Sequence, residues 1–226
     1  MRKMLTIAAA CVLSSAAAQA SVVESFDTGA YGPGWAFSNG SVTAAAAHDG
    51  GFGLNLSLSG GGTNNWNYNT LLSVSEGDVL SVWVRLHNAG RAYFGFGADA
   101  GGTQSLVAGA NTSVLLFQDN AGYSFSNIGA NPLAWTLDKW YLLEVDWTAS
   151  GNAVGKVFDS DGITLLDSLS QSGLPRSSGG FALRGFNSVD FDTITVNGAG
   201  TVPEPLPLAL LALGLSGIAL SRRRQA

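Results

Sequence analysis

The stretch that decides the fold is residues 140–147, Trp140-Tyr141-Leu142-Leu143-Glu144-Val145-Asp146-Trp147. Bulky apolar residues at every second position, 141, 143, 145 and 147, alternate with a leucine and two acidic residues. Successive side chains of a β-strand point to opposite faces, so this pattern places one face in a core and the other toward water. The segment is therefore predicted to be a half-buried strand.

The same period of two recurs along the chain, most clearly over residues 52–58, 80–86 and 94–97. Further strands are predicted at 22–26, 42–46, 68–74, 113–118, 122–127, 153–160, 163–169, 180–186 and 189–197. The pair Asp161-Gly162 joins two of these runs and is typical of a tight hairpin turn. Helical periodicity is nearly absent from residues 21–201. The fold class is therefore predicted to be all-β, a two-sheet antiparallel sandwich.

Three segments resemble concanavalin A-like jelly rolls, including the laminin-G-like domains. These are the opening Ser25-Phe26-Asp27, the strand 140–147 with the hairpin 157–162, and Gly180-Phe181-Ala182-Leu183-Arg184 leading into residues 190–196. The resemblance implies a jelly roll that fills nearly the whole domain, which we place at residues 21–198.

Residues 1–20 contain the features of a secretory signal peptide in the expected order. Arg2 and Lys3 precede an uncharged apolar or small stretch over 4–18, and Ala18-Gln19-Ala20 offers a cleavage site for signal peptidase. We therefore expect an N-terminal signal helix and export by the Sec machinery. The single cysteine, Cys11, lies inside this leader, so the mature chain is expected to lack thiols and disulfides.

The C-terminal segment 199–226 is a second targeting candidate. Val202-Pro203-Glu204-Pro205 precedes an apolar run over 206–220, and Arg222, Arg223 and Arg224 follow. About 15 residues make a helix of roughly 22 Å, short against a hydrocarbon core of roughly 30 Å. The arginines are expected to stay on the cytoplasmic side of the membrane. A transmembrane helix is predicted at 206–221.

This order of features resembles the PEP-CTERM sorting tail, which also carries the label of an ice-binding protein C-terminal domain, although the label does not indicate ice binding here. The resemblance implies processing by an exosortase in a Gram-negative bacterium that makes exopolysaccharide. The expected location is the cell envelope, the outer surface or the extracellular matrix, after passage through the inner membrane.

The charge of the mature domain excludes one class of partner. Residues 21–201 contain six basic and fifteen acidic side chains, which gives a net charge of −9. Because phosphate backbones would be repelled, nucleic acid is not an expected partner.

Carbohydrate binding is the function for which the sequence offers the most material. Sugar rings stack on exposed aromatic side chains, while amide and charged groups bind their hydroxyls. If 79–87 and 92–98 form a hairpin, the candidates share a sheet face. They are Trp66, Tyr68, Trp83, Arg85, His87 and Tyr93. The alternative is that Trp83 is buried under a loop and that Trp66 anchors a loop.

Glu144 and Asp146 are candidate catalytic residues, because they lie two positions apart on one strand face. Glycoside hydrolases use paired carboxylates on either side of a sugar bond. Some jelly-roll glucanases have a similar Glu-x-Asp strand with a further glutamate close behind, and that glutamate is missing here. A glycoside hydrolase or lyase is therefore the alternative, and a solvated outer strand face is the plainer interpretation.

No cofactor is expected, although a structural calcium ion stays open as an alternative. Asp27 would approach Asp190 and Asp192 if the first and last strands pair, and Ca²⁺ prefers such oxygen ligands. Two histidines in the whole chain disfavour a zinc site. The sequence favours a non-catalytic, envelope- or matrix-associated protein that binds exopolysaccharide, with a purely structural matrix component as a further alternative.

Overall fold

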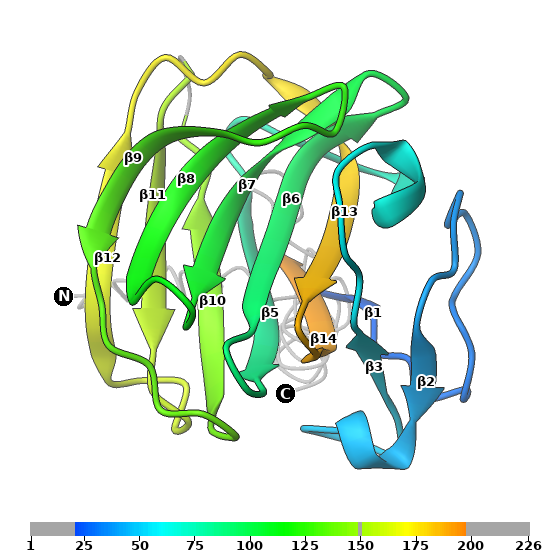
Figure 1. Cartoon of the computed structure of the whole chain (residues 1–226). Coiled ribbons are helices and arrows are strands. Elements are labelled where there is room, and N and C mark those ends of the chain that lie inside the picture. The colour runs from blue at the N-terminus through cyan, green and yellow to red at the C-terminus, as the bar shows by residue number, and fades with distance from the viewer. Residues whose placement is uncertain (1–20, 149–150, 198–226) are drawn as a thin grey trace, which may run out of the picture. The chain divides into compact units, whose positions relative to one another are not determined.

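The computed structural model describes residues 21–148 and 151–197. Over these residues the chain is all-β, with fourteen strands in two antiparallel sheets that lie face to face (Figure 1). This confirms the predicted two-sheet antiparallel sandwich. The expected helices at 1–20 and 206–221 lie outside the described residues. Within the described ranges, no helix has the length and apolar character needed to span a bilayer.

The first sheet, sheet A, contains the alternating strand at residues 140–146. Its order is β12 (Leu165–Gln171), β11 (Ala153–Phe158), β10 (Trp140–Asp146), β5 (Val79–Leu86), β14 (Val189–Asn197), β3 (Gly53–Leu56) and β2 (Ser41–Thr43). β1 (Ser21–Glu24) also pairs with β14, so the first and last described strands are neighbours, as expected.

The second sheet, sheet B, has the order β4 (Asn67–Ser75), β13 (Ser178–Phe186), β6 (Arg91–Asp99), β7 (Gly102–Gly109), β8 (Val114–Ala121) and β9 (Ser126–Pro132). Two short 3-10 helices, η1 (Ala44–Ala46) and η2 (Thr63–Asn65), lie in the connections. Strands β9, β8, β7, β6 and β13 form the curved front layer of Figure 1.

The main core lies between the two sheets and is built from alternate residues of their strands. On β5 the four residues Leu80, Val82, Val84 and Leu86 are buried, while the positions between them stay partly accessible. Sheet B contributes Phe94 and Phe181, whose parallel rings lie 6.0 Å apart. At roughly 25 cal/mol per Å² of buried apolar area, this layer dominates the stability of a chain without disulfides.

Several local predictions are wrong, including the strand expected at 42–46, whose residues 44–46 form η1. Residues 79–87 and 92–98 do not form a hairpin, because β5 pairs with β10 and β14 in sheet A while β6 pairs with β13 and β7 in sheet B. The chain crosses between the layers because the apolar sides of both strands face the same core. The predicted strand 122–127 is mostly a turn, and β9 begins at Ser126.

The Asp161-Gly162 pair does lie in a hairpin, between β11 and β12, but its loop is longer than a two-residue turn. Asp159 donates its backbone N–H to the carbonyl of Thr164, which closes a loop over 159–164. The Asp161 carboxylate accepts hydrogen bonds from the Thr164 hydroxyl and from the backbone of Ile163 and Thr164. These bonds, with the Thr164 hydroxyl first, lower the pKa of Asp161 to about 2.

Candidate functional site

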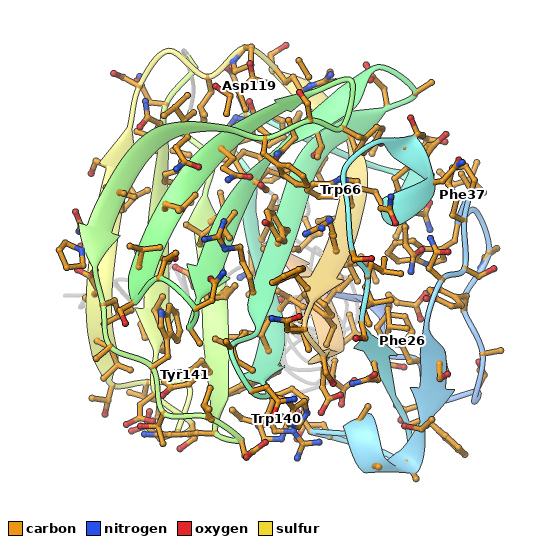
Figure 2. The ribbon with its side chains drawn as sticks, viewed as in Figure 1. Phe26, Phe37, Trp66, Asp119, Trp140 and Tyr141 are labelled. Atoms are coloured by element: carbon orange, nitrogen blue, oxygen red, sulfur yellow. The ribbon has the colours of Figure 1, made fainter. Side chains whose placement is uncertain are left out.

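The outer face of sheet B is covered by a second aromatic cluster, separate from the main core. Trp66 follows η2 and is labelled in Figure 2. Its ring packs against Tyr93 and Tyr123 at centroid distances of 5.4 and 5.5 Å. Trp66 and Tyr123 are fully buried, and Tyr93 is nearly so. The loop before β4 and the turn after β8 therefore supply rings that fill this face.

Arg184 projects from β13 into the same cluster. Its guanidinium carbon lies 4.7 Å from the ring centres of both Tyr93 and Phe125, and 6.0 Å from that of Phe186. One of its nitrogens, Nη2, donates a hydrogen bond to the Gly60 carbonyl at 2.7 Å. Arginine favours such stacking because its planar, delocalised cation is weakly hydrated. The side chain is consequently held in place although only 2% of the residue is exposed.

A pocket of about 290 Å³ opens on this part of the outer face. Its aromatic lining is Tyr93, Phe125 and Phe186, its polar lining is Arg91, Asn111 and Arg184, and the glycine loop at 60–61 completes it. Phe125 is the accessible ring, with 42% of its surface exposed. The pocket thus combines an accessible ring with polar groups at its edge.

The polar side of the pocket is positively charged. Arg91 Nε donates to Asn111 Oδ1 at 3.2 Å, and Arg91 Nη2 donates to Thr112 Oγ1 at 2.9 Å. Burial lowers the pKa of Arg184 from its ordinary value, and the nearby charge of Arg91 acts in the same direction. Arg91 and Arg184 thus place two guanidinium groups on this side of the pocket.

The six residues predicted to bind carbohydrate do not share a face. Trp66, Tyr68 and Tyr93 lie on the outer side of sheet B, where the Tyr68 ring stacks on Tyr123 at 5.4 Å. Trp83, Arg85 and His87 lie on the outer side of sheet A, across the sandwich. Trp66 is a buried anchor, which matches the plainer alternative, and Tyr93 lines the pocket wall. The single surface expected from the sequence is therefore wrong.

Trp83, Arg85 and His87 each contact other side chains on sheet A. The His48 ring stacks on Trp83 with a centroid distance of 3.8 Å. Arg85 donates to the buried carboxylate of Asp190 through Nε at 2.8 Å and Nη2 at 2.6 Å, and His87 Nε2 lies 2.6 Å from the same carboxylate oxygen. The side chains of Arg85 and His87, which were expected to face a sugar, are thus already bound to Asp190.

The charge state of His87 follows from these contacts. Burial lowers its pKa, but the hydrogen bonds to Asp190 and Asp138 outweigh burial, so the pKa is raised above 6.5. The protonated imidazole donates to two carboxylates, which suits a structural link between β5 and β14.

The candidate calcium ligands are not brought together in the described part of the chain. Asp190 is occupied by Arg85 and His87, and Asp192 Oδ2 accepts backbone N–H groups from His48 and Asp49 at 2.6 and 3.0 Å. Asp27 Oδ1 accepts the Gly51 N–H at 2.7 Å. Across residues 21–148 and 151–197, no three His, Cys, Asp or Glu side chains form a group that suits a metal ion.

Glu144 and Asp146 lie side by side on the outer face of β10, as the alternation predicts. Lys156 on the neighbouring β11 places Nζ 2.8 Å from Glu144 Oε1 and 3.9 Å from Asp146 Oδ2. The two carboxylates therefore share a cation on sheet A, on the opposite side of the sandwich from the pocket. This arrangement fits a solvated strand face.

Sequence reasoning missed Arg91, Asn111, Phe125, Arg184 and Phe186 as pocket residues. One signal was available for Arg184, because it is one of only six basic residues in 21–201 and interrupts a strand of Gly, Ala, Phe and Leu. Phe125 carried no such signal, since it lies in a turn that brings it against Arg184 only in the folded chain.

Comparison with known proteins supports the fold assignment. No family model matches the sequence, and no curated protein matches it. Among solved structures, the chain is similar to the carbohydrate-binding module CBM66 from Bacillus subtilis, with 17% identity over 73% of this chain and 96% of that one and a TM-score of 0.54. It is also similar to the calcium-bound exoplasmic/lumenal domain of VIP36, with 12% identity over 77% and 88% of the two chains and a TM-score of 0.53. At these identities the similarity establishes the fold alone, an antiparallel two-sheet sandwich.

Proposed function

We propose that the domain is a non-catalytic carbohydrate-binding module and that its binding site is the pocket on the outer face of sheet B. The observation that carries the proposal is the pocket itself, in which the accessible Phe125 ring stands beside Arg91 and Asn111. The name of CBM66 describes that protein as a carbohydrate-binding module, and the shared fold agrees with the proposal.

The pocket has the chemistry that sugar recognition requires. The face of a sugar ring carries C–H groups that pack on an aromatic ring, and Phe125 offers such a ring at the pocket mouth. The ring hydroxyls need donors and acceptors, which Asn111 and Arg91 provide. A volume of about 290 Å³ holds one sugar unit, so a longer chain would place its neighbouring units outside the pocket.

A matched pair of phenylalanine variants tests this proposal. Phe125→Ala in the purified full-length chain should weaken binding to the preferred polysaccharide of a broad panel about tenfold, or ~1.4 kcal/mol, because it removes the accessible stacking surface. Phe52→Ala is the control, since Phe52 is similarly exposed, at 37%, and does not line the pocket. Equal affinity of wild type and Phe125→Ala would refute the site, and no binding across the panel would favour a purely structural matrix component.

We also propose, from the sequence alone, that the chain is exported by the Sec machinery and sorted by an exosortase, and that exopolysaccharide is its ligand in the envelope or matrix. Mass spectrometry of native protein from envelope and matrix fractions tests the first part. The leader 1–20 should be absent, and the chain should end near residues 202–205. An intact chain recovered from the cytosol would refute it.

A further inference from the structure

The guanidinium of Arg184 has unused hydrogen-bonding capacity in a buried place. Nη2 donates to the Gly60 carbonyl and Tyr93 lies beside the guanidinium, but Nε and Nη1 are buried and make no hydrogen bond of normal geometry with any described residue. Buried charged donors without acceptors are costly and rare. The Tyr93 and Phe125 ring centres each lie 4.7 Å from the guanidinium carbon and 5.7 Å from each other, so the two rings pack on the guanidinium from adjoining directions.

The second arginine of the pocket also lacks a counter-charge. Arg91 is held by the neutral side chains of Asn111 and Thr112. Over residues 21–148 and 151–197, every other arginine is within 2.9 Å of a carboxylate: Arg85 pairs with Asp190 and Arg176 pairs with Asp99. Arg91 and Arg184, which share the pocket, form no ion pair with any described residue.

The two positive charges of the pocket contrast with the negative charge of the domain. Residues 21–201 carry a net charge of −9, yet the pocket presents two cations against apolar ring surfaces. Charges beside a low-dielectric wall act more strongly than charges in water, and a concave site concentrates their field. The site therefore attracts anions although the domain as a whole repels them.

We infer that the pocket selects an acidic saccharide, a sugar unit bearing a carboxylate or a sulfate, and that Arg184 and Arg91 recognise its oxyanion. This inference rests on the proposed carbohydrate-binding function and names its ligand class. The oxyanion supplies the acceptors that Arg184 lacks, after a small displacement of the exposed Phe125 ring. Charge-assisted hydrogen bonds of this kind are stronger than neutral ones, so the anion contributes much of the affinity.

The experiment compares three polysaccharides of similar length with the full-length chain. They are a uronic acid polymer, the same polymer with its carboxyl groups reduced to alcohols, and a sulfated neutral polymer. Wild type should bind at least one of the two anionic polymers about tenfold or more tightly than the reduced one. Preference for the uronate identifies a carboxylate as the oxyanion, and preference for the sulfated polymer identifies a sulfate. The preference should shrink as ionic strength rises.

Single variants assign the effect to the pocket. Arg184→Met and Arg91→Met should each reduce affinity for the anionic polymer about tenfold, a larger loss than either variant causes for the reduced polymer. Lys139→Met is the matched control, because it removes one positive charge that pairs with Asp159 outside the pocket, and its affinity should stay at the wild-type value.

The outcomes separate this inference from the proposed function. Equal binding of the anionic and reduced polymers, or an equal loss in Lys139→Met, would overturn the acidic-saccharide inference and leave the binding module intact. Binding of neutral glycans only would also overturn the acidic-saccharide inference and leave the binding module intact. Absence of binding to every glycan tested would overturn both.

Discussion

At the scale of single residues, Arg184 is a side chain whose burial lowers the folding stability of the domain. Its charge is buried, its pKa is lowered by burial, and two of its nitrogens lack acceptors. An unsatisfied buried donor costs about 1–3 kcal/mol, so the folded domain without ligand is less stable than it would be with an apolar side chain of similar length. A residue kept only for packing would not have this property.

We predict that Arg184→Met leaves the domain as stable as wild type or makes it more stable, by about 1 kcal/mol, while anion binding is lost. Urea unfolding of the ligand-free protein measures the first part. Arg85→Met is the comparison, because it leaves Asp190 buried with fewer partners and should destabilise the domain. A marked loss of stability in Arg184→Met would show that the guanidinium is structural.

At the scale of the elements, strands whose sequence alternates could be predicted, including β6, which is buried on both faces, and the strand without alternation, β7, could not. β5 and β10 show strict alternation, and both were identified close to their observed limits. β7 was missed, because its sequence Gly-Thr-Gln-Ser-Leu-Val-Ala-Gly has no alternation and all of its residues are buried. Its outer face is covered, so small and polar residues occupy positions where a period of two would otherwise appear.

The pocket was unpredictable for a related reason. Its parts come from the loop at 60–61, the ends of β6 and β13, the turn after β7 and the turn before β9. No local pattern connects these segments. The assumption that 79–87 and 92–98 form a hairpin also placed both strands on one sheet, and this error joined the two halves of the predicted sugar-binding set.

A close contact between the two sheets gives a prediction about β11. A Cβ atom at Gly155 would lie 2.4 Å from Leu106 Cδ1 and 3.0 Å from Phe117 Cζ, both fully buried in sheet B. Gly155→Ala should therefore destabilise the domain by about 1–3 kcal/mol through overpacking. Gly51→Ala is the control, because a Cβ there meets nothing within 4 Å. Chemical denaturation of both variants measures the difference, and equal midpoints would contradict the close packing.

For the whole molecule, the hydrogen bonds of His87 predict how stability varies with pH. The pKa of His87 is raised in the folded state, so the folded protein binds the proton of His87 more tightly than the unfolded chain does. Its contribution is fully present below pH 6.5 and disappears as the pH rises through the higher pKa of the folded state.

The melting temperature should accordingly decline above pH 6.5 in wild type, and His87→Asn should flatten that decline. Thermal unfolding between pH 5.5 and 8.5 tests this, with His48→Asn as the control for the other histidine. A decline of the same size in His87→Asn would assign the effect to another group.

The pairing of β1 with β14 has a mechanical consequence. Ser21 lies opposite Val196 and Val22 opposite Thr195, so the domain's two ends leave from neighbouring points of one ladder. Tension applied between these ends would break the β1–β14 hydrogen bonds one after another, starting at this end of the pair. In a pair of strands pulled in opposite directions along their length, all hydrogen bonds carry the load together and break together. A domain held by both ends would thus yield at low force, and one tethered at a single end would feel no such load.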